Sequence, residues 1–518
     1  MGVSVFYFDQ LLHGIERRSL WLIPAVALLR LVFVASSELD LIGDEAYYWE
    51  WSRRPDWCYF SKPPMVAWLI GGFTWLLGDE TWVVRLPAVV LGAVSLWFLQ
   101  ATARGFFGPR ASVLCLLLIL ATPAQVLANF LMTIDPPLYC FWIMTLYFLR
   151  RALFADDSRA WWWAGFSAAA ALLSKQAALL LPLMLAVFLL LDAQRRHYLR
   201  REFCWFLLPV VLVVVQIVVW NHAHDWVMFG HSKSHFTPHD AIDGWQRLKH
   251  GLEFIAYQLL LLSPLIWLMT LGVTLQGLVQ FKTLSAERRF LWLFGPVLIL
   301  AVIALSLLQK VQGNWPMPFY LSALILLAGD WLDGHWSRLM KPALAFGAML
   351  VVITYALPLA LKLLHLQGTP LDPTKRFNQW RTMAASIDAG RRKTGVDLAD
   401  SFVIATGHRY LASGLAFYLA GHPPVFRFET SGMVQSQYEL WSAPDAGFSG
   451  KDAFVVSEDG PDRFSPKLAA AFQSLTWIAR INNPARPQHP YHLYLGRQLT
   501  HWPGFFLDAH HEYANTAP

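Results

Sequence analysis

Residues 20–50 read LWLIPAVALLRLVFVASSELDLIGDEAYYWE, and this stretch indicates the fold class. Its first part, 20–36, is apolar except for Arg30 and is nearly as long as the roughly 20 helical residues that cross a bilayer. Acidic and aromatic residues follow directly. An apolar run that ends in a polar, aromatic loop is typical of a membrane-spanning helix and its interfacial loop.

The composition of the whole chain agrees with this interpretation. Of the 518 residues, 56% are hydrophobic and 15% are charged, whereas soluble domains carry about 25% charged residues. No heptad or Gly-X-Y period runs through the chain, which excludes coiled coil and collagen. The four cysteines include no C-x-x-C pair, so neither a disulfide framework nor a zinc site is indicated. We attribute the net charge of +6 to basic loops facing anionic lipid, and we expect no nucleic-acid partner.

Apolar runs that are long enough, or nearly long enough, to span a bilayer recur along the chain. They predict a polytopic α-helical membrane protein with about eleven transmembrane helices, with an error of about two. The stretch 160–191 leaves open one long helix or a tight hairpin at Ser174-Lys175. The runs are 20–36, 86–102, 111–128, 136–149, 161–173, 176–191, 204–220, 259–281, 290–308, 315–329 and 343–361.

Lys and Arg are concentrated in alternate loops, and this bias predicts the orientation. With the N-terminus and its Arg17 and Arg18 inside, 64–78 must not cross, because an extra span would reverse every later loop. We therefore interpret 64–78 as an amphipathic helix on the outer surface. Alternation then places the basic loops inside, as the positive-inside rule expects: 103–110, 150–160, 193–203, 282–289 and 330–341.

The composition changes from about His365, where charged residues, Gly and Pro return. We predict a membrane domain over 1–365, whose first outer loop (37–85) carries surface helices, and an exoplasmic α/β domain over 366–518. A helical pattern covers 409–420 and ends at Gly421. No P-loop or G-x-G-x-x-G motif supports a nucleotide site. The expected strands are 402–405, 424–428, 453–457, 477–481 and 491–495.

With this topology, unusual polar residues collect on the outer face. Ionisable residues at membrane depth cost several kcal/mol unless they are paired or hydrated, so they are candidates for function. Lysines near aspartates predict an anionic ligand beside an acid/base carboxylate. The collected residues are Asp44, Glu45, Arg53, Arg54 and Lys62 in the first loop, Asp135 and Lys175 at later loop ends, His222, His231, His235 and His239 in 221–250, and Lys310; Arg30 lies within the first span.

Each of these residues also has a purely structural interpretation. Asp44 and Glu45 could form the first turn of a surface helix, where the helix dipole favours their charge. Asp135 before two prolines could be a helix N-cap. Lys175 and Lys310 could extend to the lipid headgroups. The convergence of these residues from separate loops favours function.

The motifs of the first 365 residues resemble the GT-C-fold glycosyltransferases. The similarity is to the bacterial branch related to protein O-mannosyltransferases and to the aminoarabinose transferase of lipid A. The motifs that carry the resemblance are Arg30, Asp44-Glu45-Ala46-Tyr47-Tyr48-Trp49, Tyr59-Phe60-Ser61-Lys62-Pro63-Pro64, Arg85-Leu86-Pro87, Asp135-Pro136 and Ser174-Lys175.

The resemblance implies an inverting transfer of a sugar from a polyprenyl-phosphate donor to an envelope acceptor, with lipid A or another glycolipid favoured, outside the bacterial inner membrane. Asp44 matches the catalytic aspartate and Glu45 its neighbour, Lys62 matches the lysine on the lipid phosphate, and Asp135 matches a second acidic position. Ser61 replaces a glutamate, which leaves a metal site that uses this carboxylate without support. Further donor-phosphate contacts are expected from Arg53, Arg54, Lys175 and Lys310, and substrate or divalent-metal contacts from Arg30, Tyr48, Tyr59, His222 and His231.

Two other functions remain open from the residues. One is a protein O-mannosyltransferase-like enzyme, which would differ in its acceptor. The other is a transporter or flippase of lipid-linked sugars, which should carry charges near the membrane midplane and show repeat symmetry. The charges here gather at one face and no repeated half is evident, so the enzyme is the favoured hypothesis.

Overall fold

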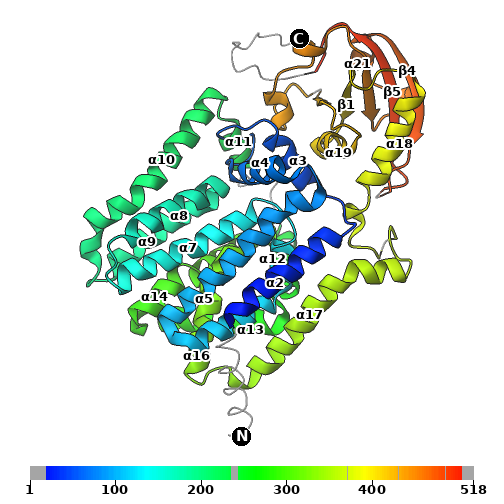
Figure 1. Ribbon diagram of the computed structural model, residues 1–518. Helices are drawn as coiled ribbons and strands as arrows, with labels where there is room; N and C mark the ends of the chain where they lie inside the picture. The colour runs from blue at the N-terminus through cyan, green and yellow to red at the C-terminus, as the bar shows by residue number, and fades with distance from the viewer. Residues whose placement is uncertain (1–18, 235–242, 370, 430, 485, 505–518) are drawn as a thin grey trace. The chain divides into compact units, whose positions relative to one another are not determined.

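The computed structural model describes residues 19–234, 243–369, 371–429, 431–484 and 486–504. The chain forms two compact units, and each is described by itself (Figure 1). Unit 1 contains the segment that ends at Ser36 together with Arg85–Ile217 and Lys233–Leu357. Unit 2 contains Ser37–Val84, Val218–Ser232 and the chain from Pro358 onward. The segment Ser37–Val84, which was predicted to be the first outer loop, therefore shares a compact unit with the C-terminal part of the chain.

Unit 1 is a bundle of helices in which α7 packs along α8, and α16 packs against α13, α14 and α15 (Figure 1). Short 3-10 turns (Gln176–Leu179, Arg196–Leu199 and Phe281–Thr283) join some of them. The helices that lie wholly or mainly in this unit are α2 (Ser19–Ser36), α5 (Thr81–Leu120), α6 (Pro123–Ala128), α7 (Asp135–Phe154), α8 (Ala160–Ser174), α9 (Leu180–Leu191), α10 (Arg201–Ala223), α12 (Gly244–Leu262), α13 (Pro264–Val279), α14 (Ala286–Leu293), α15 (Pro296–Ser306), α16 (Met317–Leu332) and α17 (Ser337–Leu363).

Four helical stretches of the described chain are long and apolar enough to cross a membrane: Thr81–Leu120, Arg201–Ala223, Ala286–Ser306 and Ser337–Leu363. A fifth is possible if α12 and α13, which meet at 112°, count as one broken span. Shorter apolar helices cover other predicted runs, such as Trp21–Ser36 and Met317–Leu332. The count of about eleven spans stays a prediction.

The helix over the predicted span 259–281 is broken rather than continuous. The chain breaks at Ser263, whose φ of 69° and ψ of 145° are not helical, and α13 restarts with Pro264 at its first turn. A proline has no N–H to donate and disfavours helical backbone in the residue before it, so it begins helices well and continues them badly. The same effect splits 111–128, where Thr122 is extended before Pro123 begins α6.

The alternatives for 160–191 are decided at Lys175. Helix α8 ends at Ser174, and Lys175 is extended, with φ −159° and ψ 138°, before the 3-10 turn that leads into α9. One continuous helix is therefore excluded. The predicted surface helix corresponds to α4 (Met65–Leu77) in unit 2; its 13 residues measure about 20 Å at 1.5 Å each and cannot cross a core of about 30 Å.

Unit 2 is built on a five-stranded sheet of order β2-β1-β3-β5-β4. Strand β1 pairs in parallel with β2 and with β3, and β5 is antiparallel to β3 and β4. Each predicted strand and the predicted helix are present. The last two strands are about twice as long as predicted, because β4 begins five residues earlier and β5 ends four residues later. The elements are β1 (Phe402–Thr406), α19 (Arg409–Tyr418), β2 (Val425–Phe428), β3 (Ala453–Ser457), β4 (Phe472–Ile481) and β5 (Tyr491–Leu499).

The core of this sheet domain is apolar and includes Phe402, Ile404, Val455 and Phe472. Helix α19 packs on β1 and β2, and α18 (Trp380–Lys393) packs on α19 and β4 (Figure 1). Against α19 lies α3 (Gly43–Ser52) of the first outer loop, which also packs on α4. The remaining helical pieces of unit 2 are α11 (Val227–Ser234), α20 (Asp445–Phe448), α21 (Pro466–Ala470) and the 3-10 turns Lys375–Phe377, Gln437–Leu440 and Pro461–Arg463.

Candidate active site

Helix α3 presents Asp44 in its first turn. Ile42 is extended and Glu45 folds back, so that its Oε2 accepts the Ile42 N–H at 3.0 Å. This contact satisfies one of the amide groups that a helix start leaves unpaired. The structure thus gives Glu45, a predicted catalytic neighbour, a capping contact. Asp44 makes a different set of contacts.

The Asp44 carboxylate is half-buried and faces α19. The Tyr410 hydroxyl donates to Asp44 Oδ1 at 2.7 Å. Burial raises the pKa of Asp44, and the Tyr410 hydrogen bond and the positive charges of Arg409 and Lys62 oppose that rise. A carboxylate with a raised pKa beside two cations is suited to accept a proton next to an anionic group.

Lys62 lies in a loop whose shape depends on Tyr59. The Tyr59 ring stacks on Trp51 with centroids 4.4 Å apart, and its hydroxyl donates toward the carbonyls of Trp51 and Arg54 at 3.1 and 3.2 Å. The Tyr59 N–H donates to the Lys62 carbonyl at 3.0 Å. Tyr59 was predicted to contact substrate, but it is fully buried with its hydroxyl bound to backbone, so it anchors the loop instead.

The two arginines of the first loop face an acidic partner. Glu50 is fully buried, with Arg53 at 3.2 Å and Arg54 at 3.8 Å from its carboxylate. Arg53 also donates to the His422 carbonyl at 3.1 Å, and Arg54 lies over the Trp441 ring at 4.2 Å. Arg53 and Arg54, which were predicted to contact the donor phosphate, therefore pair with Glu50 instead.

The other residues of this unit that were predicted to contact substrate or metal lie on α3 and in the segment 218–232. Tyr48 is buried and packs edge-on against Trp51 at 5.0 Å. The His231 ring lies 4.9 Å from Phe60, close in sequence to Lys62. His222 is exposed and lies near Trp226. His235 and His239 lie outside the described residues, and among the described ones no group of three or more His, Cys, Asp or Glu is arranged to hold a metal.

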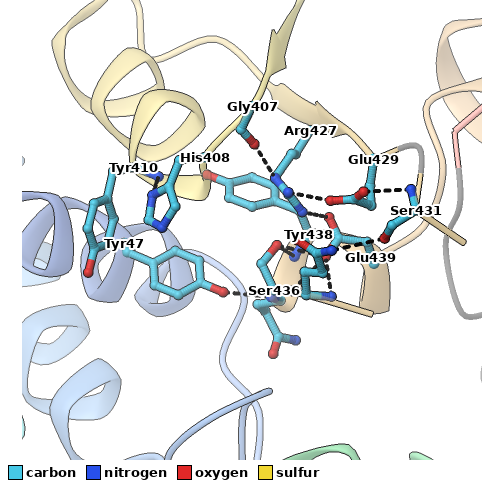
Figure 2. Close-up of polar contacts among 12 residues, drawn as sticks. Tyr47, Gly407, His408, Tyr410, Arg427, Glu429, Ser431, Ser436, Tyr438 and Glu439 are labelled. Atoms are coloured by element: carbon cyan, nitrogen blue, oxygen red, sulfur yellow. Dashed lines mark hydrogen bonds and ion pairs between the residues drawn. The ribbon is translucent and has the colours of Figure 1, made fainter. Parts of the chain in front are cut away.

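Residues of the C-terminal domain form hydrogen bonds with α3 and with the loop that follows it. The Gln437 N–H donates to the Tyr47 hydroxyl at 2.6 Å, and Gln437 Oε1 accepts the Phe60 N–H at 2.7 Å. Figure 2 shows Tyr47 pointing toward this segment. Behind it, Arg427 binds Glu429 and the Glu439 carboxylate, the latter at 2.7 Å. The segment that contacts Tyr47 and Phe60 therefore rests on a paired, buried polar cluster.

A second polar cluster lies in unit 1 around Asp135. Lys175 Nζ is 2.9 Å from Asp135 Oδ1, and Asn314 donates to the other carboxylate oxygen at 2.5 Å. Lys175 thus pairs with Asp135 rather than extending to the headgroups. Arg30 is 4% exposed and interacts with Tyr355, and Lys310 is exposed before Asn314. That these residues and Asp44 share one pocket stays a prediction.

Arg409 and Tyr410 are candidate site residues that the sequence did not indicate. Their segment has only the pattern of an amphipathic helix, and more than 350 residues separate them from Asp44 in the chain. The single local signal is an arginine at a helix start, where the dipole disfavours a cation. The bond from Asn314 to Asp135 likewise has no signal in the sequence.

Residues 61–220 match the family model for dolichyl-phosphate-mannose-protein mannosyltransferase. Lipid A galacturonosyltransferase RgtD from Rhizobium johnstonii is 25% identical over 455 residues, which cover 85% of this chain and 91% of that protein. Crystal structures of ArnT from Cupriavidus metallidurans, apo and bound to undecaprenyl phosphate, align with TM-scores of 0.63 and 0.62 at 16% and 17% identity, over 92% of this chain and 97% of theirs.

The chain has the GT-C fold. It is a helical membrane protein with a C-terminal sheet domain, as the ArnT structures indicate. The resemblance expected from the motifs, to GT-C glycosyltransferases related to protein O-mannosyltransferases and lipid A-modifying enzymes, is confirmed.

Proposed function

We propose that this GT-C protein is an inverting glycosyltransferase that moves a sugar from a polyprenyl-phosphate donor to lipid A or another envelope glycolipid. The observation that carries the proposal is the half-buried Asp44 carboxylate beside Lys62, on a chain that matches RgtD over 91% of that protein. RgtD is a lipid A galacturonosyltransferase, and ArnT has been crystallised with undecaprenyl phosphate. Both names support a lipid-linked donor and a lipid acceptor.

The chemistry follows from the charges around Asp44. The carboxylate takes the proton of an acceptor hydroxyl, whose oxygen attacks the anomeric carbon of the sugar. The bond between this carbon and the phosphate oxygen breaks on the opposite face, so the configuration inverts. Lys62 stabilises the negative charge that grows on the departing polyprenyl phosphate. If the acceptor is itself a phosphate, it is already ionised and Asp44 positions it.

The same proposal includes the sidedness predicted from loop charge. Nucleotide sugars are absent outside the cytoplasmic membrane, so an outward-facing transferase needs a donor on a lipid. We propose that the sheet domain and α3 face the periplasm and that the helices form about eleven spans of the inner membrane. Asp135 with Lys175 is a second acidic centre in this proposal, and the paired geometry supports a role in orienting a bound group.

The match of residues 61–220 to a protein mannosyltransferase model keeps a protein acceptor as the second candidate. The two enzymes differ in where the sugar is found after the reaction. A transporter of lipid-linked sugars would produce no glycosylated acceptor at all.

The test compares lipid A, polyprenyl-phosphate sugars and glycoproteins, by mass spectrometry, in cells that carry or lack the gene. We expect a sugar on lipid A or another glycolipid only in cells that carry the gene, and accumulation of the polyprenyl-phosphate donor in cells that lack it. Asp44→Asn should lower turnover about 10²- to 10⁴-fold, the usual contribution of a general base. The control is Asp397→Asn, an exposed carboxylate in the C-terminal domain. Full activity of the Asp44 variant would remove this residue from the chemistry, and sugar found on protein would select the second candidate.

A further inference from the structure

The cations beside Asp44 come from both ends of the chain. Lys62 belongs to the first outer loop, and Arg409 is the first residue of α19 in the sheet domain. Both act on the Asp44 carboxylate, and Arg409 is the stronger of the two. The arginines that the sequence placed here, Arg53 and Arg54, are instead on Glu50.

Arg409 is held in place without being neutralised by an ion pair. Its guanidinium carbon lies 5.4 Å from the Tyr47 ring centroid and 5.0 Å from that of Tyr410. It belongs to none of the ion pairs of the described chain, and its Nε is buried without a hydrogen-bond partner. The nearby Arg427, in contrast, is bound by Glu429 and Glu439.

The local structure at Arg409 opposes a cation. Positive charge is favoured at helix C-termini, yet Arg409 occupies the N-terminal position of α19. His408 caps this helix by accepting the Tyr410 N–H at 3.3 Å, and burial together with the charges of Arg409 and Arg427 lowers the pKa of His408 to about 4. The positive charge at this end of α19 therefore comes from Arg409 and the helix start, because His408 is neutral and Arg427 is paired with two carboxylates.

Arg409 also lies at a position in the sheet topology where other open α/β sheets bind ligands. Strand β1 lies between its parallel neighbours β2 and β3, so the chain leaves β1 toward one side and later returns on the other. Such a switch leaves an opening at the carboxyl end of the central strand. Arg409 follows this end of β1 after Gly407 and His408, both seen in Figure 2.

We infer that Arg409, together with Lys62, binds an anionic group of the sugar donor beside Asp44. This inference rests on the proposed function and adds the C-terminal domain to its substrate site. A guanidinium presents two parallel N–H groups to a phosphate or a carboxylate, whereas an ammonium acts as a point charge. The anion is therefore an oxyanion, either the phosphate of the carrier lipid or the carboxylate of a uronic acid sugar.

The experiment uses the full-length protein in lipid nanodiscs and the variants Arg409→Gln, Arg409→Lys and Lys62→Gln. The first arm measures the affinity of sugar-free undecaprenyl phosphate. The second arm measures KM and kcat with polyprenyl-phosphate donors that carry either galacturonic acid or the neutral galactose. The matched control is Arg497→Gln. Arg497 lies on β5 of the same domain and pairs with Asp452 at 2.6 Å.

We expect Arg409→Gln to weaken binding roughly ten- to a hundredfold, as a lost charged hydrogen-bonding group does, and Arg409→Lys to recover part of it. If undecaprenyl phosphate and both donors weaken equally, the anion is the lipid phosphate. If only the uronic acid donor weakens, the anion is its carboxylate. Equal behaviour of Arg409→Gln, Arg497→Gln and the wild type in both arms would overturn the inference. The first arm needs no turnover, so it separates this failure from failure of the proposed function.

Discussion

At the scale of single residues, the site depends on how Asp44 is kept ionised. Burial alone favours its neutral form, and the bond from Tyr410 opposes this at 2.7 Å. A group that accepts a proton must be ionised, so activity falls as the pH drops through its pKa. In the proposed mechanism the acid limb of the pH profile follows the pKa of Asp44. The Tyr410 hydrogen bond lowers this pKa, although Tyr410 itself forms no bond in the reaction.

We predict that Tyr410→Phe moves the acid limb of kcat/KM to higher pH. A hydrogen bond to a charged group contributes about 1.5–3 kcal/mol, and 1.36 kcal/mol corresponds to one pKa unit, so a shift of about one to two units is expected. Activity at pH 8 to 9 should fall less than activity at pH 6. A uniform loss at every pH would mean that Tyr410 only holds the structure. Tyr491→Phe on β5 serves as the control because it lies on another element.

At the scale of elements, α3 and α19 approach closely at Gly43. A Cβ at this position would lie 2.3 Å from the Tyr410 ring, inside any allowed contact distance. The glycine is therefore required by the packing of the two helices and by the position of the Tyr410 hydroxyl, rather than by its backbone conformation.

We predict that Gly43→Ala destabilises the protein by about 1–3 kcal/mol, because the added methyl group overpacks the contact between α3 and α19. The same change shifts Tyr410 from Asp44 and should lower turnover. The measurement is kcat together with the thermal unfolding midpoint. Gly72→Ala on α4 is the matched control, since a Cβ there meets nothing within 4 Å and alanine favours a helix. Equal activity of the two variants would show that this approach is dispensable.

At the scale of the molecule, unit 2 joins segments that are far apart in the chain. The Trp380 N–H donates to Asp40 at 2.7 Å and the Leu41 N–H to Tyr418 at 2.6 Å, so the C-terminal part of unit 2 binds the chain just before Asp44. Gln437 extends the same attachment to Phe60, near Lys62. The C-terminal part of unit 2 therefore contacts the segment that carries Asp44 and Lys62 directly.

We predict that Gln437→Ala loosens the Lys62 loop. Removing its side chain leaves the buried Phe60 N–H unpaired at a cost of about 1–3 kcal/mol, so exchange of this amide with deuterium should accelerate roughly 5- to 150-fold. Mass spectrometry of exchanged peptides over 53–64 measures this. Gln435→Ala is the control, because that exposed side chain bonds only to Ser431. Unchanged exchange in the Gln437 variant would contradict the attachment.

The sequence by itself determined the membrane class, the strands and helix of the C-terminal domain, and the candidates Asp44, Lys62 and Asp135. These depend on local patterns: long apolar runs, short β-rich segments, and charges beside Pro-Pro and Asp-Pro motifs. The break at Ser263-Pro264 also has a local signal, the proline. An apolar run taken as a whole nevertheless predicts one continuous helix there.

Only the tertiary structure decided which charges act on Asp44. Nearness in the chain predicts Arg53 and Arg54, but both pair with the Glu50 carboxylate, because burying that charge without a partner would cost several kcal/mol. Arg409 takes their place by way of a helix packed against α3. Electrostatic interaction depends on distance in space, and no local pattern records a contact across more than 350 residues.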